Sequence, residues 1–515
     1  MRMQYRTVGR DLGRILQIVS LMLLVSVLIA AINGELYAIP AFVASAIVVG
    51  GLGLGLARRY RSAPEPGKLE AMVTAATAWG AVGLLGSLPF LFVAWTIALD
   101  PYPAWANTPA MTDTVAVFLR PVHGVFESIS GFTSTGLTMA VVEEELPRSI
   151  HWWRSFTEWI GGVGVIVLTV AILARPGSGS LTLFESEARS EKIHPSIVST
   201  VTEIWKIYLG FTLAGIVLFL VAGMPPWDAL NHAMTGISTG GFSVHADSIG
   251  HYGSPAIEYA VIPVMVAGSI AFPIHYLILK GEVSNFYRDI QTRWVFVWFT
   301  AGSLLLTGLL AVNGQYDTLE ETFRIGLFQF VSATSNAGFG TATLGGGTER
   351  VWTAGPTFLL CLGMLTGAAA GSTVGGLKLV RVLVLLKGTV WQIRSVFVPE
   401  TAVRHLRLGA RSLDKTQVER EYTEAAVVFV LWILFLMLGV AVFLWTLPPS
   451  YPAEYVIFDV MSAQSTVGLD TGITGPDMPE AAKVVLIFNM WVGRLEIIPV
   501  AVLLGTVLER LNLYR

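Results

Sequence analysis

The sequence predicts an all-α integral membrane protein. We expect four pseudo-symmetric units of helix, re-entrant pore loop and helix around a central pore, preceded by two N-terminal transmembrane helices. The first reason is composition, because 53% of the 515 residues are hydrophobic and only 13% are charged, about half the charged fraction of a soluble domain. The second reason is a short pattern, rich in Ser, Thr and Gly, that occurs four times in the chain.

Composition also excludes several classes of protein. The single cysteine, Cys361, rules out an internal disulfide framework and a cysteine-cluster metal site. The net charge of −3 provides no basic surface for nucleic acid. The chain contains no H-E-x-x-H motif, and we predict that it is not an enzyme.

Ten apolar segments are long enough to cross a bilayer. They lie at 15–33, 37–57, 71–97, 153–174, 203–223, 256–279, 294–312, 352–387 (interrupted), 424–446 and 482–507. If the N-terminus is cytoplasmic, most of the 33 Lys and Arg residues fall in cytoplasmic segments, as the positive-inside rule requires. We therefore expect a multi-pass protein with both termini in the cytoplasm. More than half of the 36 acidic residues then lie outside, where they would concentrate cations.

The repeated pattern lies in four connections on the predicted outer side. Its copies are F-E-S-I-S-G-F-T-S-T-G-L (126–137), N-H-A-M-T-G-I-S-T-G-G-F (231–242), F-Q-F-V-S-A-T-S-N-A-G-F (328–339) and F-D-V-M-S-A-Q-S-T-V-G-L (458–469). Each copy has Ser or Thr in its fifth column and glycine in its eleventh. The glycines are Gly136, Gly241, Gly338 and Gly468.

A short helix is predicted before each of these glycines. The four helices are expected at 121–132, 226–237, 318–334 and 452–464. They are too short to span a bilayer, so the chain must enter and return on the same side. Backbone that leaves a helix at membrane depth is tolerated only where it is buried in protein or lines water. Close packing of small residues would explain one or two copies of the pattern, but it does not explain four.

These features predict a cation filter. A short helix whose C-terminus points at an axis presents partial negative charge to a cation, and the carbonyls of the chain that follows can replace a hydration shell. Glycine permits backbone conformations that a Cβ would oppose. We therefore predict a two-helix extension at 1–69 and four units at 70–175, 176–280, 281–420 and 421–515. The second helix of the third unit is expected to be broken.

The repeats resemble those of the Trk/Ktr/HKT superfamily of potassium transporters, and specifically its bacterial TrkH/TrkG branch. W-I-G-G-V-G-V-I-V-L-T-V-A-I-L (159–173), G-A-A-A-G-S-T-V-G-G-L-K-L-V-R (367–381) and V-G-R-L-E-I (492–497) also fit that branch. The resemblance implies M1–P–M2 units, potassium uptake and a homodimer in the bacterial inner membrane. It also implies a cytosolic nucleotide-binding regulatory partner of the TrkA type, with K⁺ as the permeating ion and no cofactor in this chain.

The resemblance also implies which residues coordinate the ion through their backbone. They are Ser134, Thr135, Gly136, Thr239, Gly240, Gly241, Asn336, Ala337, Gly338, Thr466, Val467 and Gly468. The residue before each glycine differs between copies, which is tolerable because carbonyls coordinate the ion. This difference leaves open a weakly selective pathway for potassium and sodium.

Two features are candidates for a gate. The first is a small-residue stretch that interrupts the eighth span, where the family has an intramembrane loop. Its members are Gly367, Ala368, Ala369, Ala370, Gly371, Ser372, Thr373, Gly375 and Gly376. The second is Arg494 in the last span, since a charge at this depth marks a functional position by default. The alternatives are close helix packing for the stretch and an ion pair, for example with Glu158, for the arginine.

Several charged residues receive structural interpretations. Glu127 and Asp459 share one column of the repeat and are expected to tether pore helices by hydrogen bonds. Lys378 and Arg381 are expected to mark the cytoplasmic end of the broken helix and to extend toward water. His275 is expected to be a hydrogen-bonded helix-end residue. Because few titratable groups lie within spans, we favour a gated pathway. A symporter that couples potassium to protons or sodium stays an alternative.

Overall fold

The computed structural model describes residues 3–100, 106–173, 197–399, 404–409 and 411–510. This part of the chain is almost entirely helical. Its named strands form two short antiparallel hairpins, in which β1 (Gly345–Gly346) pairs with β2 (Glu349–Arg350) and β3 (Leu406–Leu408) pairs with β4 (Arg411–Leu413). The predicted boundary between the first two units, at 175/176, lies outside the described residues.

Six helical segments of the described chain are long and apolar enough to cross a membrane. They are α1 (Tyr5–Ile32), α2 (Ile39–Arg59), α3 (Lys68–Leu85) continued by α4 (Leu88–Leu99), α9 (Ile197–Val221), α14 (Ile290–Val312) and α18 (Lys415–Thr446). Each coincides with a predicted span, and several extend beyond the predicted ends because polar first turns, such as that of α18, carry no apolar signal.

Two predicted spans are not continuous helices. The segment predicted at 256–279 forms α11 (Pro255–Ser269) and α12 (Phe272–Leu279), which meet at 102°. The segment predicted at 482–507 forms α20 (Glu480–Arg494) and α21 (Ile498–Arg510), which meet at 113°. In both pairs the second residue of the second helix is a proline, which has no N–H to continue the preceding helix.

The remaining long segments are α7 and a broken pair. Helix α7 (Arg148–Leu173) covers the fourth predicted span. The predicted interruption of the eighth span is confirmed, because α16 (Ala354–Leu365) and α17 (Leu379–Ser395) are separated by a non-helical loop. Shorter elements connect the helices: η1 (Leu36–Ala38), α5 (Asp113–Ala116), η3 (Val117–Leu119), η4 (Glu143–Glu145), η5 (Ser248–Tyr252) and α13 (Ser284–Arg288).

The four predicted short helices are present, each within one residue of the predicted ends. They are α6 (Pro121–Phe132), α10 (Pro226–Ile237), α15 (Leu319–Thr334) and α19 (Ala453–Ser465). Each packs between one helix that precedes it and one that follows it in the chain. Thus α6 lies between α3 and α7, α10 between α9 and α11, α15 between α14 and α16, and α19 between α18 and α20. Each also contacts one helix of a neighbouring group, in the pairs α7–α10, α11–α15, α16–α19 and α20–α6.

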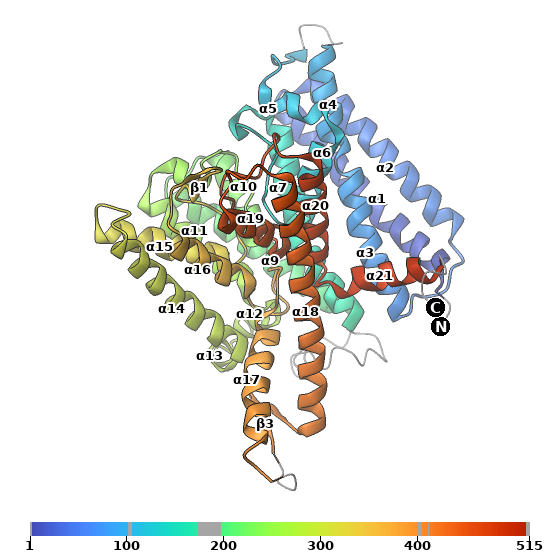
Figure 1. Ribbon diagram of the computed structural model, residues 1–515. Helices are drawn as coiled ribbons and strands as arrows, with labels where there is room; N and C mark the ends of the chain where they lie inside the picture. Colours follow the sequence, from blue (N-terminus) through green and yellow to red (C-terminus); the bar gives the residue numbers. More distant parts are fainter. Residues whose placement is uncertain (1–2, 101–105, 174–196, 400–403, 410, 511–515) are drawn as a thin grey trace.

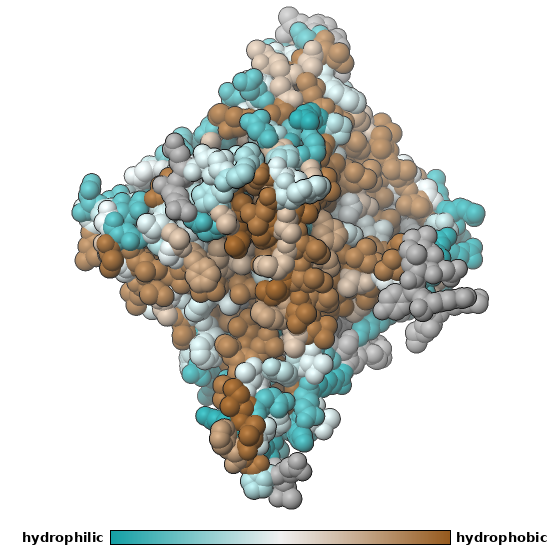
Figure 2. Space-filling model, viewed as in Figure 1, coloured by the Kyte–Doolittle hydropathy of each residue, from teal (hydrophilic) through white to brown (hydrophobic). Residues whose placement is uncertain are grey.

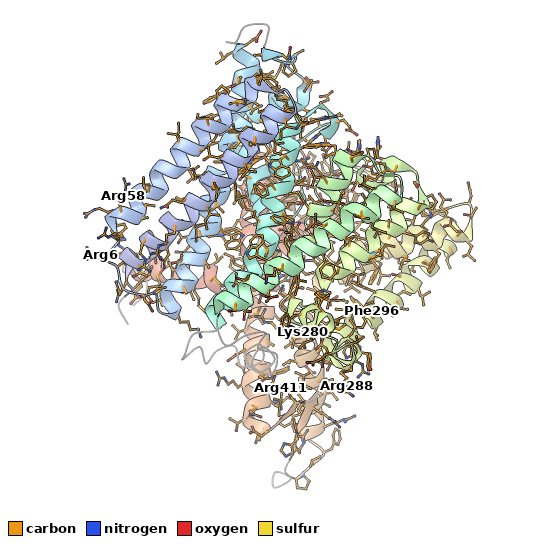
Figure 3. The ribbon with its side chains drawn as sticks, turned by 180° about the vertical axis from the view of Figure 1, so that it is seen from behind. Arg6, Arg58, Lys280, Arg288, Phe296 and Arg411 are labelled. Carbon is orange, nitrogen blue, oxygen red and sulfur yellow. The ribbon has the colours of Figure 1, made fainter. Side chains whose placement is uncertain are left out.

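The surface matches this arrangement. An apolar surface covers the middle of the molecule in Figure 2, and hydrophilic residues gather at its upper and lower ends. Helix α17 and the first half of α18 extend downward together to the hairpin that contains β3 (Figure 1). Lys280, Arg288 and Arg411 lie toward this lower end, whereas Arg6 and Arg58 mark the shared end of α1 and α2 (Figure 3).

Candidate functional site

All four short helices end in the same backbone motif. After α6, the Ser134 N–H donates to the Gly131 carbonyl (2.8 Å) and the Thr135 N–H donates to the Ser130 carbonyl (2.8 Å). This is a Schellman ending, which requires a left-handed residue directly after the helix cap. That residue is Ser134, Thr239, Asn336 and Thr466 in the four copies, with φ of 49°, 52°, 55° and 56°.

A left-handed conformation at a residue other than glycine costs about 1–3 kcal/mol, so the surroundings must hold it. The Ser134 hydroxyl donates to the Glu158 carbonyl (3.0 Å), and the Thr239 hydroxyl donates to the Ser238 carbonyl (2.7 Å). The Asn336 amide donates to a carbonyl of the fourth loop. These side chains are fully buried, so the loops cannot relax without breaking their contacts.

The glycine column closes the four loops into a ring. Gly136, Gly241, Gly338 and Gly468 all have positive φ, at 90°, 88°, 68° and 98°. A Cβ on any of them would collide with the carbonyl oxygen that precedes the glycine of the next loop. In that order, the carbonyls belong to Gly240, Ala337, Val467 and Thr135. The glycine of the fourth loop meets a carbonyl of the first loop, so the contacts form a closed ring. All twelve predicted filter residues are thereby brought together.

A cavity of about 420 Å³ lies over this ring, and all four repeat glycines line it. Its wall also carries the acidic residues Glu143, Asp247 and Asp470, together with Arg154 and His245. Burial raises the pKa of the Glu143 carboxyl to about 7, although Arg154 opposes the shift. Glu143 is therefore only partly ionised near neutral pH.

The glycine-rich interruption between α16 and α17 forms a compact, mostly buried loop. Thr366 and Leu377 pair as an isolated bridge that closes its neck, and the residues between them are buried apart from the partly exposed Gly371. The predicted gate residues Gly367, Ala368, Ala369, Ala370, Gly371, Ser372, Thr373, Gly375 and Gly376 all lie in this loop between α16 and α17, which we call the intramembrane loop after that prediction.

The intramembrane loop touches the ring directly. The Thr239 and Thr373 hydroxyl oxygens lie 3.1 Å apart, and this contact joins the second filter loop to the intramembrane loop. A Cβ on Gly375 would collide with the Thr466 hydroxyl of the fourth filter loop. The break between α11 and α12 leaves backbone groups free to hold the loop, and the Thr373 N–H donates to the Gly268 carbonyl (3.2 Å).

Arg494 connects the same elements. Its guanidinium donates to the Thr373 carbonyl (2.7 Å), to the Gly161 carbonyl (2.7 Å) and to the Ser134 hydroxyl (3.2 Å). None of the ion pairs in the described chain joins Arg494 to Glu158, so the predicted alternative of that ion pair is wrong. The side chain is 1% exposed and binds neutral oxygens, so its positive charge is not cancelled by a directly bound carboxylate.

Comparison with known proteins identifies the family. The TrkH family model, described as a cation transport protein, matches residues 106–513. The chain belongs to the TrkH family. It is 34% identical over 504 residues to an uncharacterized cation transporter of Methanocaldococcus jannaschii, covering 96% of this chain and 94% of the relative. The Trk system potassium uptake protein TrkH of Escherichia coli K12 is 30% identical, with 97% and 98% covered.

A solved structure agrees with this assignment. The crystal structure of the potassium transporter TrkH from Vibrio parahaemolyticus is 27% identical, with a TM-score of 0.81 and coverage of 98% of this chain and 99% of that one. The fold is therefore that of TrkH. Because TrkH is a family of ion transporters, this chain is not an enzyme, and the family requires no cofactor.

In this TrkH-family chain, one repeat column fixes the segment that follows each filter glycine. Glu127 accepts from the Met139 N–H (2.8 Å), and Asp459 accepts from the Thr471 N–H (2.9 Å), so the predicted tethers are confirmed. The column continues in the other copies with His232, which contacts the Ser243 hydroxyl (2.9 Å), and Gln329, which donates to the Ala342 carbonyl (3.2 Å). We did not predict these two tethers, although their place in the aligned repeats was a sufficient signal.

Removing the charge of Glu127 is expected to destabilise the TrkH-family fold by about 3–5 kcal/mol. Glu127 accepts from Arg154 Nε at 2.7 Å, and the two side chains are 0% and 2% exposed. Glu127→Gln keeps the shape but leaves Arg154 as an uncompensated buried charge. Thermal unfolding in detergent, followed by tryptophan fluorescence, should show a clearly lower Tm.

The matched control for this experiment is Glu419→Gln. Glu419 pairs with Lys415 at 4.0 Å, and these side chains are 50% and 75% exposed. An exposed pair contributes about 0–1 kcal/mol, so the Tm of this variant should stay close to that of the parent. Equal Tm values for both variants would contradict the tether assigned to Glu127.

The predicted role of Lys378 is wrong. Its side chain does not extend to water but is buried, with Nζ 3.9 Å from Glu496 Oε1. Arg381 binds the same carboxylate, with a nitrogen–oxygen distance of 2.5 Å. Glu496 lies at the break between α20 and α21, where Glu496 and Ile497 have φ of 54° and 70°. The ion pairs hold the end of the intramembrane loop against this strained break.

His275 is a structural residue, as expected. Its Nε2 lies 2.9 Å from the Ala267 carbonyl, which the break between α11 and α12 leaves without a helical partner. The ring packs edge-on against Phe211 and Phe272. These contacts hold the imidazole in the packing between α9 and α12.

Proposed function

We propose that this chain takes up potassium across the bacterial plasma membrane, through the ring of four loops. The observation that carries the proposal is the cyclic contact of the four repeat glycines, each against the carbonyl of the next loop. Carbonyls arranged around an axis replace the hydration shell of a permeating cation. Relatives of this chain are named Trk system potassium uptake proteins, which supports potassium as the ion.

The proposal includes a fourfold pseudo-symmetric architecture. In it, residues 1–69 form an extension, and the units 70–175, 176–280, 281–420 and 421–515 each contribute one pore helix. The support is that every short helix packs between the helices before and after it, and that contacts between the groups also run in a closed order. A closed order of contacts is what four units around one axis require.

The ion would be coordinated by backbone carbonyls of the twelve filter residues. The C-termini of α6, α10, α15 and α19 precede these residues, and helix C-termini carry partial negative charge that favours a cation. The filter loops contain no titratable side chain between their fifth and last columns. A symporter needs a group that changes state in each cycle, so a gated pathway is favoured over coupling to protons.

The proposed gate consists of the intramembrane loop and Arg494. The loop binds the second and fourth filter loops, and Arg494 binds both the loop and Ser134. An arginine without a bound carboxylate beside a cation pathway raises an electrostatic barrier. Movement of the loop would therefore change both the width of the pathway and the position of this charge.

The proposal places the chain in the bacterial inner membrane as a homodimer, with both termini in the cytoplasm. A cytosolic nucleotide-binding subunit of the TrkA type would then bind the lower end of the molecule. The support is the basic character of the segment around β3 and β4, which includes Arg404, Arg407 and Arg411, and the positive-inside rule. The phrase "Trk system" in the names of relatives implies further components.

Reversal potentials in proteoliposomes test the function. With potassium and sodium gradients imposed across the membrane, the potential should reverse at the potassium equilibrium value and should not move when pH or sodium is changed. Liposomes that contain the Gly223→Ser variant should behave in the same way, because nothing lies within 4 Å of a Cβ at Gly223. A reversal potential that follows the proton or sodium gradient would contradict the proposal and support coupled transport.

A further inference from the structure

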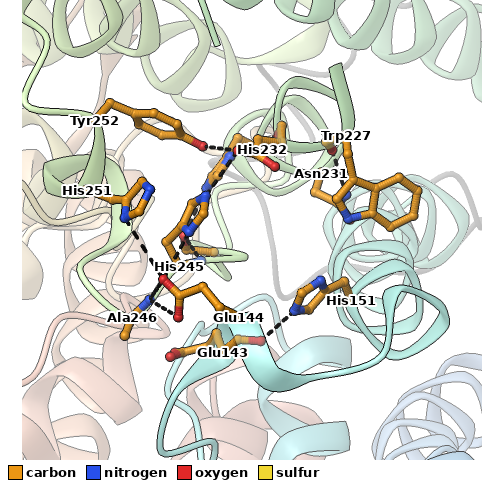
Figure 4. Close-up of polar contacts among 12 residues, drawn as sticks. Glu143, Glu144, His151, Trp227, Asn231, His232, His245, Ala246, His251 and Tyr252 are labelled. Carbon is orange, nitrogen blue, oxygen red and sulfur yellow. Dashed lines mark hydrogen bonds and ion pairs between the residues drawn. The ribbon is translucent and has the colours of Figure 1, made fainter. Parts of the chain in front are cut away.

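Three potential metal ligands converge at the rim of the outer cavity. Glu144 belongs to η4, and His245 and His251 belong to the segment between the second filter loop and α11. Figure 4 shows their side chains directed toward one another. We propose that Glu144, His245 and His251 form a binding site for a zinc ion, which the repeats and the filter do not account for.

The distances fit such a site. Glu144 Oε1 is 3.0 Å from His245 Nδ1 and 4.0 Å from His251 Nδ1, and one ligand atom from each residue lies within 4.8 Å of the others. In a tetrahedral zinc site with bonds of about 2.0–2.2 Å, ligand atoms are about 3.3 Å apart. The Glu144 and His245 ligand atoms, 3.0 Å apart, are already close to this separation. His251 is exposed, so its ring can approach by the remaining distance without disturbing the core.

The orientation of His245 is fixed by a second carboxylate. His245 Nε2 lies 3.0 Å from Asp228 Oδ2, and the Tyr252 hydroxyl donates to the same oxygen at 2.8 Å. When Nε2 carries its proton toward Asp228, Nδ1 presents a lone pair toward Glu144. Carboxylate–histidine–metal arrangements of this kind orient most metal-binding histidines, and the pairing with Asp228 is therefore a second indication of a metal site.

The two imidazoles are also arranged side by side. Their ring centroids are 3.6 Å apart and their planes differ by 4°. An imidazole nitrogen binds a metal ion in the plane of its ring, so the exposed His251 must rotate out of this stack to share an ion with His245. The Ala246 N–H lies 3.4 Å from both Glu144 oxygens, which keeps that carboxylate facing the segment that carries both histidines.

The donor set selects the metal. Two imidazole nitrogens and one carboxylate oxygen, with a fourth position open to water, are the ligands of an open zinc site. Calcium and magnesium prefer sites made of oxygen atoms only. Because Glu144 and His251 are exposed, a zinc ion in the external solution can reach the site without any rearrangement of the filter.

Zinc binding should affect the transport pathway. His245 lines the same cavity as the four filter glycines, so a bound divalent cation would oppose the entry of potassium by electrostatic repulsion. This consequence rests on the proposed function, whereas binding itself does not. The two are therefore measured separately.

The binding experiment uses the full-length protein without an affinity tag, purified in detergent and dialysed against zinc chloride. We expect one zinc ion per chain at this site. The His251→Ala and Glu144→Gln variants should bind zinc at least about tenfold more weakly, because loss even of a residue that only orients a metal ligand lowers metal affinity about 10–100-fold. The control is His405→Ala, which removes an exposed histidine beside β3 and should bind zinc like the parent. No zinc binding by the parent, or unchanged binding in both ligand variants, would overturn the proposal.

The transport experiment adds zinc chloride outside proteoliposomes that take up potassium. Uptake by the parent and by His405→Ala should slow at zinc concentrations that His251→Ala tolerates, with equal uptake by all three proteins in the absence of zinc. Equal sensitivity of His251→Ala and the parent would overturn the effect on transport. If the parent shows no potassium uptake at all, the proposed function fails, and the dialysis experiment still decides whether the zinc site exists.

Discussion

Gly468→Ser is expected to lower potassium uptake about tenfold or more and to reduce discrimination against sodium. Gly468 has φ of 98°, and forcing another residue into such a conformation costs about 1–3 kcal/mol, equivalent to about tenfold or more at 1.4 kcal/mol per factor of ten. The new Cβ would also collide with the Thr135 carbonyl of the first loop, which the proposal assigns to ion coordination. Uptake assays with potassium-42 or rubidium-86, and bi-ionic reversal potentials, measure both effects.

Gly223→Ser provides a control with matched backbone strain. Gly223 has φ of 97°, but nothing lies within 4 Å of a Cβ built there. It therefore carries the same conformational cost without displacing a carbonyl of the ring. We expect its ion selectivity to equal that of the parent. Unchanged selectivity in Gly468→Ser, in protein that remains folded, would contradict the assignment of the filter.

Arg494→Ala is expected to raise the basal potassium flux about thirtyfold. A unit charge about 8 Å from a cation path contributes about 2 kcal/mol at an effective dielectric constant of 20, which corresponds to about thirtyfold in rate. The substitution also removes the bonds from Arg494 to the Thr373 carbonyl and the Ser134 hydroxyl, so the intramembrane loop loses one of its attachments. Flux is measured in proteoliposomes without any regulatory partner.

The control for Arg494 is another buried arginine that binds backbone carbonyls. Arg10 donates to the Ala63 carbonyl (2.5 Å) and the Pro64 carbonyl (3.1 Å), at the end of the α1–α2 hairpin and far along the chain from the filter. Arg10→Ala should lower the Tm without raising the flux. A basal flux in Arg494→Ala no higher than that of the parent would contradict the gate, provided the variant remains monodisperse.

The repeat alignment predicted the four short helices and the loops that meet in the glycine ring, for a physical reason. Four copies in one chain must each end a short helix, turn through a left-handed residue and pass the next copy closely. The column of Ser, Thr or Asn provides the left-handed residue, and the glycine column permits the close approach to the next copy. Local sequence therefore encodes each loop, including its tether at Glu127 or Asp459. His232 and Gln329 complete the same column, but their chemistry differs too much for the pattern to be recognised by residue type alone.

The breaks within spans could not be predicted in the same way. Segments 256–279 and 482–507 are predominantly apolar, and hydropathy does not distinguish a straight helix from one bent by more than 100°. The bends are stabilised by distant groups: the Gly371 carbonyl accepts from the Phe272 N–H (3.1 Å), and Arg381 binds Glu496. Burial of Lys378 has the same cause, because its partner Glu496 is more than 100 residues away in the sequence.

The sequence by itself determined the membrane environment, the helical class, the four short helices and the left-handed and glycine positions of the loops that follow them. These features depend on hydropathy, helix length and local turn chemistry, which act over fewer than about 25 residues. Only the tertiary structure decided the cyclic order of the four glycines, the attachment of the intramembrane loop to two filter loops, the neutral partners of Arg494 and the cluster at Glu144, His245 and His251. Each of these depends on groups that meet only after distant helices pack, and the energy of such contacts leaves no signal in a local pattern.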